Sequence, residues 1–332
     1  MDSMVLAAML EVIQNENHEV DSVTVIRNGY MVVDAAVYPY DQNTTHPIHS
    51  CTKSIVSALI GIGIEEGNIE SVQVPVLDFF PDRLADNIDA NKEEMTLEDL
   101  LTMTSGFDCT DSYLYRWSGL NQMRGSEDWI QFMLDLPMTA TPGTQFEYCN
   151  GASFLLSAII TETSGVSAFE FAKTHLFGPL GITDVVWPTN PQGINIGWGE
   201  LSMLPHDLAK IGYLYLREGQ WDGEQIVPSS WVEDSTQEYI SATLEDGYGY
   251  QWWVDDSGVY MALGYAGQFI FVVPEKDMVV VFTSDLGESD FYVPQVLLGD
   301  YIIPAAESLA PIPFDASAES LLRQQIEDLS SP

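Results

Sequence analysis

The stretch His49-Ser50-Cys51-Thr52-Lys53-Ser54 leads directly into the apolar run Ile55–Ile64, followed by Gly67-Asn68. Residues three apart on a helix are neighbours on one face, so the Ser50 hydroxyl and the Lys53 amine should point into the same space. The run is apolar nearly all round, which is typical of a buried helix, and Gly67-Asn68 is a helix stop signal. The sequence therefore predicts a small nucleophile and an amine at the start of a buried helix.

This pair fits nucleophilic catalysis. A serine hydroxyl is a poor nucleophile until a base takes its proton, and burial at a helix N-terminus disfavours the charged form of a lysine. At the same position the Ser50 backbone N–H would point outward, as one donor of an oxyanion hole. A capping serine with a solvent-facing lysine is disfavoured because the helix is too apolar to have a solvent face. The chain also has only five lysines and no second Ser-x-x-Lys.

A second candidate element is Tyr148-Cys149-Asn150, the sole Tyr-x-Asn in the chain, which follows 142–147 (PGTQFE). A phenol near a cationic lysine has its phenolate form favoured, and it could carry a proton between Ser50 and a leaving group. The Asn150 amide could orient Lys53 or bind a substrate carbonyl. A packed tyrosine followed by a turn-capping asparagine is the structural alternative, and the motif alone favours neither.

Composition excludes several classes of partner. The 332 residues are 46% apolar, as in an ordinary globular chain, and they carry a formal net charge of −39. Such a chain repels nucleic acid and anionic lipid, so neither is expected as a partner. The acids are scattered, which suggests a highly solvated surface of the kind that high salt favours. No apolar run approaches the roughly 18 residues of a membrane span, and the sequence carries no signal for an oligomeric state.

The cysteines and the N-terminus bear on the cellular compartment. Cys51, Cys109 and Cys149 are odd in number and lack a Cys-x-x-Cys spacing, so we expect three reduced, mostly buried thiols and neither a disulfide nor a metal site. Residues 1–10 lack a basic segment and Glu11 interrupts them, which is unlike a signal peptide. The sequence thus predicts a cytoplasmic protein, or an exported one if a leader was trimmed.

Strand patterns open and close the chain, with helices between them. Asn28-Gly29 is a hairpin signal between strands over 22–28 and 30–38. We predict an α+β fold, an antiparallel sheet flanked by helices. Residues 1–68 and 205–332 would form a discontinuous sheet domain and 69–204 a mostly helical insertion, with the active site in the cleft between them. The other expected elements are helices over 4–14, 96–101, 125–136, 151–163, 205–216 and 291–303, and strands over 249–254, 259–263, 268–273 and 278–284.

Ser50-x-x-Lys53 and then Tyr148-x-Asn150 resemble the penicillin-recognising serine hydrolase superfamily. The Tyr-x-Asn motif is similar to that of class C β-lactamases, family VIII carboxylesterases and 6-aminohexanoate-dimer hydrolases. The resemblance implies a β-lactamase/transpeptidase-like fold and an acyl-enzyme on Ser50, with Lys53 as its base, Tyr148 as the acid and base for the leaving group and water, and no cofactor or metal. It covers roughly residues 20–300, and further stretches that carry it are 99–106, 142–144, 207–212 and 271–274.

The third motif of this branch, Lys-Thr-Gly or His-x-Gly on the strand beside the nucleophile, is missing. Lys210-Ile211-Gly212 lies in a helical pattern, so the matching strand should be 259–264. If Gly264 is the motif glycine, the Tyr265 N–H is the second oxyanion donor, which we favour. If Gly267 is, the donor is the Gln268 N–H. Without a Lys or Arg on this strand, a substrate carboxylate has no partner, which counts against a β-lactamase or D,D-peptidase.

We therefore predict a serine hydrolase of small esters, a carboxylesterase. An amidase on small linear amides, a β-lactamase or D,D-peptidase, and a non-catalytic binding protein of the same fold are the alternatives. His49 is interpreted as structural and His206 as a helix cap. Aromatic residues that could line an acyl pocket or overhang the site, although packing is the more ordinary interpretation, are Trp252, Trp253, Tyr113, Tyr115 and Trp117.

Overall fold

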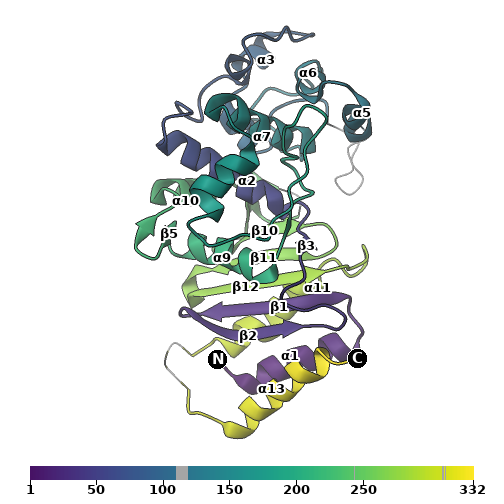
Figure 1. Cartoon of the computed structure of the whole chain (residues 1–332), viewed down its shortest axis with the longest axis vertical. Coiled ribbons are helices and arrows are strands. Elements are labelled where there is room, and N and C mark those ends of the chain that lie inside the picture. Colours follow the sequence, from purple (N-terminus) through teal and green to yellow (C-terminus); the bar gives the residue numbers. More distant parts are fainter. Residues whose placement is uncertain (110–118, 243, 309, 311) are drawn as a thin grey trace. The chain divides into compact units, whose positions relative to one another are not determined.

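The computed structural model describes residues 1–109, 119–242, 244–308, 310 and 312–332 (Figure 1). It divides into two compact units. Unit 1 comprises Met1–Cys51, Ser202–Arg217 and Gly258–Pro332, and unit 2 comprises Thr52–Leu201 and Glu218–Ser257. Both are discontinuous in sequence. The predicted sheet domain, 1–68 and 205–332, differs from unit 1. It includes the helix after Ser50 and residues 218–257, which the structure assigns to unit 2.

Unit 1 is built on five antiparallel strands in the order β2-β1-β12-β11-β10. Every residue of β11 and β12 is buried, which explains their nearly unbroken apolar sequences. Within the same unit the short strands β3 (His46–Pro47) and β4 (Ser202–Met203) pair with one another. The five strands span Val20–Arg27 (β1), Tyr30–Ala36 (β2), Tyr260–Gly264 (β10), Gln268–Val273 (β11) and Met278–Ser284 (β12).

The hairpin signal is confirmed. Arg27 pairs with Tyr30, and between them Asn28 and Gly29 have φ angles of 52° and 76°. Positive φ at both central residues is the geometry of a type I′ turn, which matches the twist of the two strands.

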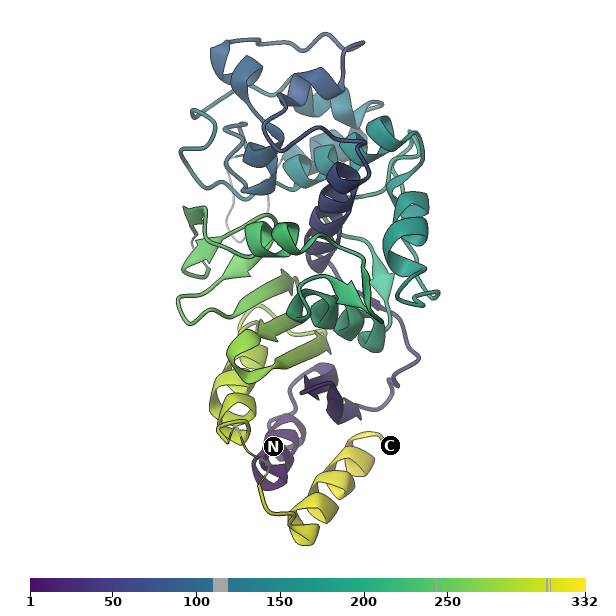
Figure 2. The ribbon, with the colours of Figure 1, turned by 90° about the vertical axis from the view of Figure 1, so that its left-hand side faces the viewer.

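Helices cover the strands of unit 1. α9 (Pro205–Leu216) packs on β1, β11 and β12. A Cβ at Gly212 would lie 2.6 Å from a methyl of Val279 and 2.7 Å from one of Ile270, so only glycine allows this close packing. α1 (Ser3–Asn15) and α13 (Ala316–Leu329) lie side by side in Figures 1 and 2, and α13 also reaches β2.

Unit 2 is mostly helical. Its two longest helices are α2 (Cys51–Glu65), whose first residue still belongs to unit 1, and α7 (Asn150–Ser164). Residues 51–63 are buried without interruption, as the apolar sequence predicts. The shorter elements are α3 (Ala90–Glu94), α4 (Leu97–Leu101), α5 (Gly119–Gly125), α6 (Trp129–Leu134), α8 (Ala168–Ala172) and α10 (Ser229–Ser235), with the strands β5 (Gln220–Trp221), β6 (Glu224–Gln225), β7 (Ile240–Ser241), β8 (Gly247–Tyr248) and β9 (Trp253–Val254).

Three predicted elements are wrong in part. The helix expected over 125–136 is only Trp129–Leu134, because α5 ends at Gly125 and Asp128 caps α6 by accepting a hydrogen bond from the Gln131 N–H. The strand expected over 249–254 is only Trp253–Val254, because Gln251 turns the backbone with φ 63°. The helix expected over 291–303 runs from Val293 to Ala305 with a π-helical turn inside it.

The C-terminal helix α13 was not predicted from the sequence. Asp315 caps it by accepting hydrogen bonds from the N–H groups of Ser317 and Ala318. Among the described residues, no single helix has both the length and the apolarity to cross a membrane. The helices Asn150–Ser164 and Ala168–Phe177 have that length and apolarity only when they are counted as one segment, and the chain bends by 74° between them.

Candidate active site

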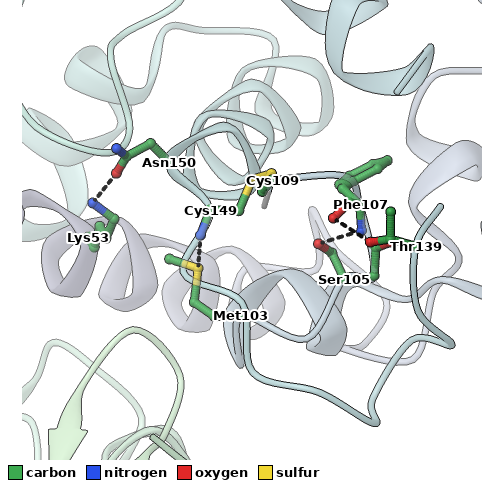
Figure 3. Close-up of a disulfide and its surroundings, with 9 residues drawn as sticks. Lys53, Met103, Ser105, Phe107, Cys109, Thr139, Cys149 and Asn150 are labelled. Atoms are coloured by element: carbon green, nitrogen blue, oxygen red, sulfur yellow. Dashed lines mark hydrogen bonds between the residues drawn. A yellow bond between two sulfur atoms is a disulfide. The ribbon is translucent and has the colours of Figure 1, made fainter. Parts of the chain in front are cut away.

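Unit 2 brings three of the predicted site residues together around a buried amine. Lys53 lies in the first turn of α2 and is 1% exposed. Its Nζ donates hydrogen bonds to Asn150 Oδ1 at 2.9 Å (Figure 3) and to the Trp198 carbonyl at 2.8 Å. The same Nζ lies 4.7 Å from the centre of the Tyr148 ring, a cation–π distance. Lys53, Tyr148 and Asn150 thus form one cluster, as their pairing in the sequence predicts.

The turn after α4 holds the Tyr148 segment in place. Thr96 and Asp99 start α4 with a complete capping box, and beyond its end Met103 has φ 58°. The Met103 carbonyl accepts a hydrogen bond from the Glu147 N–H at 2.8 Å, and its sulfur accepts one from the Cys149 N–H at 3.4 Å (Figure 3). The residues on both sides of Tyr148 are therefore fixed by one methionine.

Aromatic rings enclose Tyr148. The Trp253 ring stacks on it at 5.8 Å between ring centres, and Tyr248 meets it edge-on at 6.5 Å. Burial, and to a lesser degree the neighbouring Tyr148, raise the pKa of Tyr248 well above its ordinary value. Tyr248 therefore stays neutral at physiological pH. Trp252 is fully buried.

A disulfide joins Cys109 to Cys149, between Tyr148 and Asn150 (Figure 3). The expectation of three reduced thiols is therefore wrong for two of them, whereas Cys51 is a reduced, buried thiol as expected. The Cα atoms are 5.6 Å apart, within bridging range, although 40 positions separate the residues in sequence. Only the folded chain reveals this pairing. The expected overhanging residues Tyr113, Tyr115 and Trp117 lie outside the described residues.

In unit 1 the end of β10 lies beside the backbone that leads to Ser50. A Cβ at Gly264 would be 2.5 Å from the Ile48 carbonyl oxygen, a distance that real Cβ atoms do not reach. The His49 and Tyr265 rings meet edge-on at 5.6 Å. Ser50 directly precedes α2, and Cys51 donates from its sulfur to the Gln268 carbonyl at 3.5 Å. The strand predicted to carry the third motif is thus adjacent to the candidate nucleophile.

The two candidate glycines of this strand face different neighbours. Gly267 has φ 85°, and a Cβ there would lie 2.5 Å from a methyl of Leu286. Gly267 therefore serves the turn between β10 and β11, whereas Gly264 faces the segment before Ser50. This difference favours Gly264 over Gly267 as the glycine of the third motif.

The structure also bears on the sequence interpretations of Lys210 and His206. Lys210 pairs with Asp207 on α9 at 2.7 Å, consistent with its rejection as a motif residue. The interpretation of His206 as a helix cap is wrong, because Leu204 is the N-cap of α9 and makes no side-chain hydrogen bond there. His206 instead contacts Asp34 at 2.8 Å. Within the described ranges, no group of three or more His, Cys, Asp or Glu side chains is arranged to hold a metal ion.

Comparisons with known proteins identify the family and the fold of this chain. A family model described as Beta-lactamase matches residues 11–295. The 6-aminohexanoate-dimer hydrolase of Paenarthrobacter ureafaciens is 24% identical over 294 residues, which cover 81% of this chain and 74% of that protein. Solved structures share this fold. EstCE1, a hydrolase with promiscuous acyltransferase activity, has a TM-score of 0.76 at 15% identity, over 90% of this chain and 99% of that one.

Another solved structure with this fold is the octameric penicillin-binding protein homologue from Pyrococcus abyssi. It has a TM-score of 0.67 at 24% identity, over 89% of this chain and 77% of that one. The chain belongs to the Beta-lactamase family. It has the β-lactamase/transpeptidase-like fold and is a hydrolase of this family, as its sequence motifs predict.

Proposed function

We propose that this chain is a serine hydrolase that cleaves small neutral esters through an acyl-enzyme on Ser50. The observation that carries the proposal is the buried Lys53 amine, which lies against the Tyr148 ring and is hydrogen-bonded to Asn150. This amine is in the first turn of the helix that Ser50 precedes. A buried amine held by directed acceptors next to a serine is an arrangement for proton transfer.

Each residue has a role in the proposed reaction. Lys53 takes the Ser50 proton while the Ser50 oxygen attacks the ester carbonyl. The oxyanion is held by the backbone N–H groups of Ser50 and Tyr265. Tyr148 protonates the leaving group and then activates the water that releases the acyl group. A neutral lysine amine has two N–H groups, and Asn150 Oδ1 and the Trp198 carbonyl can accept both, which orients its lone pair.

The charge of the chain supports a neutral substrate. The strand β10 and the turn 265–267 carry no Lys or Arg that could hold a substrate carboxylate. The net charge of −39 also repels anions over long range. Substrates with a carboxylate beside the scissile bond, such as β-lactams and peptidoglycan peptides, are therefore disfavoured.

A second candidate is an amidase acting on small linear amides. The similarity to the 6-aminohexanoate-dimer hydrolase of Paenarthrobacter ureafaciens favours it, and the same residues would serve both reactions. Side-by-side turnover of a short-chain p-nitrophenyl ester and an aminohexanoate dimer separates the two. The amidase is the better description if the dimer is turned over with the higher kcat/KM.

The direct test compares the wild type with Ser50→Ala on a p-nitrophenyl ester panel. We expect hydrolysis by the wild type and loss of nearly all of it in the variant. Undiminished hydrolysis by Ser50→Ala would end the proposal. A wild type that neither hydrolyses the panel nor reacts with a fluorophosphonate would favour a non-catalytic binding protein of this fold.

A further inference from the structure

Gln251 has an unusual backbone conformation for a residue that is not glycine. It lies in the connection between β8 and β9, is 2% exposed and has φ 63°. A residue with a Cβ is disfavoured in this left-handed region, where glycine is the usual choice. The sequence pattern predicts a continuous strand here, so neither its local propensity nor its periodicity explains the turn. The explanation lies in the hydrogen bonds that Gln251 makes.

These hydrogen bonds reach three helices of unit 2. The side-chain Nε2 donates to the carbonyl oxygens of Leu101 at 2.7 Å and Leu100 at 3.2 Å, at the end of α4. The side-chain Oε1 accepts from Ser153 Oγ of α7 at 2.7 Å. The backbone carbonyl accepts from Ser54 Oγ of α2, also at 2.7 Å. The Gln251 N–H donates to Leu101 as well, at 3.1 Å.

Each of these helices positions part of the candidate site. Ser54 follows Lys53 on α2, and Ser153 lies one turn after Asn150 on α7. The end of α4 leads to Met103, which fixes the residues on both sides of Tyr148. One buried residue is thus bonded through its backbone to the helix that carries the base, and through its side chain to the helix that carries Asn150 and to the helix that leads to Met103.

We infer that Gln251 is a positioning residue that sets the placement of Lys53 against Asn150 and Tyr148. The inference rests on the proposed function, and Gln251 itself touches no reacting atom. Its left-handed backbone presents the carbonyl to α2 while the side-chain amide spans α4 and α7. Glycine could adopt the same backbone more easily, but it would lose the links to Ser153, Leu100 and Leu101 through the side chain.

The test is Gln251→Gly, because glycine relieves the backbone strain and keeps the main-chain hydrogen bonds. We expect a folded protein whose kcat for p-nitrophenyl ester hydrolysis, per fluorophosphonate-titrated site, falls roughly 10- to 100-fold with little change in KM. The acidic limb of its kcat–pH profile should also move. Ser153→Ala and Ser54→Ala, which each remove one link, should lower kcat in the same direction by a smaller factor.

Ser57→Ala is the matched control, because it changes the same residue type at a fully buried position of α2, one turn beyond Ser54. It should leave kcat and the pH profile unchanged. A Gln251→Gly enzyme with wild-type kcat and pH profile per labelled site would overturn the inference.

Hydrogen–deuterium exchange of residues 150–155 gives a readout that does not depend on activity. If the wild type neither hydrolyses esters nor reacts with fluorophosphonate, the proposed function fails and this exchange decides the positioning role alone. Faster exchange in Gln251→Gly than in Ser57→Ala supports that role, and equal exchange refutes it.

Discussion

Replacing Asn150 with alanine removes an acceptor of the buried Lys53 amine, which Asn150 Oδ1 meets at 2.9 Å. A hydrogen bond to a charged group is worth about 1.5–3 kcal/mol, and its loss in the transition state lowers a rate roughly 10- to 150-fold. Because Asn150 orients the base in the proposed reaction, this loss should appear in kcat. The assay is p-nitrophenyl ester hydrolysis per fluorophosphonate-titrated site, as a function of pH.

Two replacements of Asn150 should move the pH profile in opposite directions. Alanine removes an acceptor that favours the ammonium form of Lys53, so the acidic limb should move to lower pH. Aspartate places a carboxylate beside the same amine and favours the ammonium form, so the limb should move to higher pH and activity near neutrality should fall. Limbs that move together, or not at all, would refute the role of Lys53 as the base.

Asn190→Ala is the control for both variants. Asn190 is a buried asparagine of unit 2 whose Oδ1 accepts hydrogen bonds from the N–H groups of Gln192 and Ile194. Its replacement should reduce stability without changing kcat per titrated site. A wild-type kcat in Asn150→Ala, with this control behaving as expected, would contradict the assignment of Asn150.

Three further predictions concern the surroundings of the site. Gly264→Ala places a Cβ 2.5 Å from the Ile48 carbonyl and should lower kcat roughly 10- to 1000-fold by displacing an oxyanion donor, whereas Gly287→Ala, with open space around it, should not. Reducing the Cys109–Cys149 disulfide, which closes 40 positions of sequence, should lower the free energy of unfolding by up to about 4 kcal/mol, and urea unfolding with and without dithiothreitol measures this. Burial lowers the pKa of Lys92 from its ordinary value of 10.5, so the unfolded chain holds this proton more tightly and stability should rise with pH below 10.5. Lys92→Met should lack this rise and be less stable by at least about 2 kcal/mol, because three carbonyl oxygens lose their donor. A pH dependence of unfolding identical to that of the wild type would contradict the Lys92 account.

The parts of the fold and site that the sequence predicts are those with local signals. The apolar run after Lys53 predicts a buried helix because burial on all sides requires apolar residues on all sides. The capping box of Thr96 and Asp99 and the turn at Asn28-Gly29 depend on residues at most three positions apart. The pairing of Lys53 with Tyr148 could be predicted only because two rare motifs occur together, and their roles in catalysis remain proposals.

The parts that the sequence did not predict depend on long-range contacts or on the backbone. The Cys109–Cys149 bond joins residues that no spacing rule connects. The Trp198 carbonyl that accepts from Lys53 is a backbone group, which any residue type at that position would supply. Gln251 sits in a strand-like sequence, and its turn is stabilised by bonds to three helices distant in the chain. Such features follow from the packing of the folded chain.

The most direct test of the central proposal is peptide mass spectrometry after reaction with a fluorophosphonate or a slowly released ester. The mechanism predicts one covalent adduct on Ser50, absent from Ser50→Ala and formed far more slowly in Lys53→Ala. An adduct on another residue, or an unchanged adduct in Ser50→Ala, would contradict it.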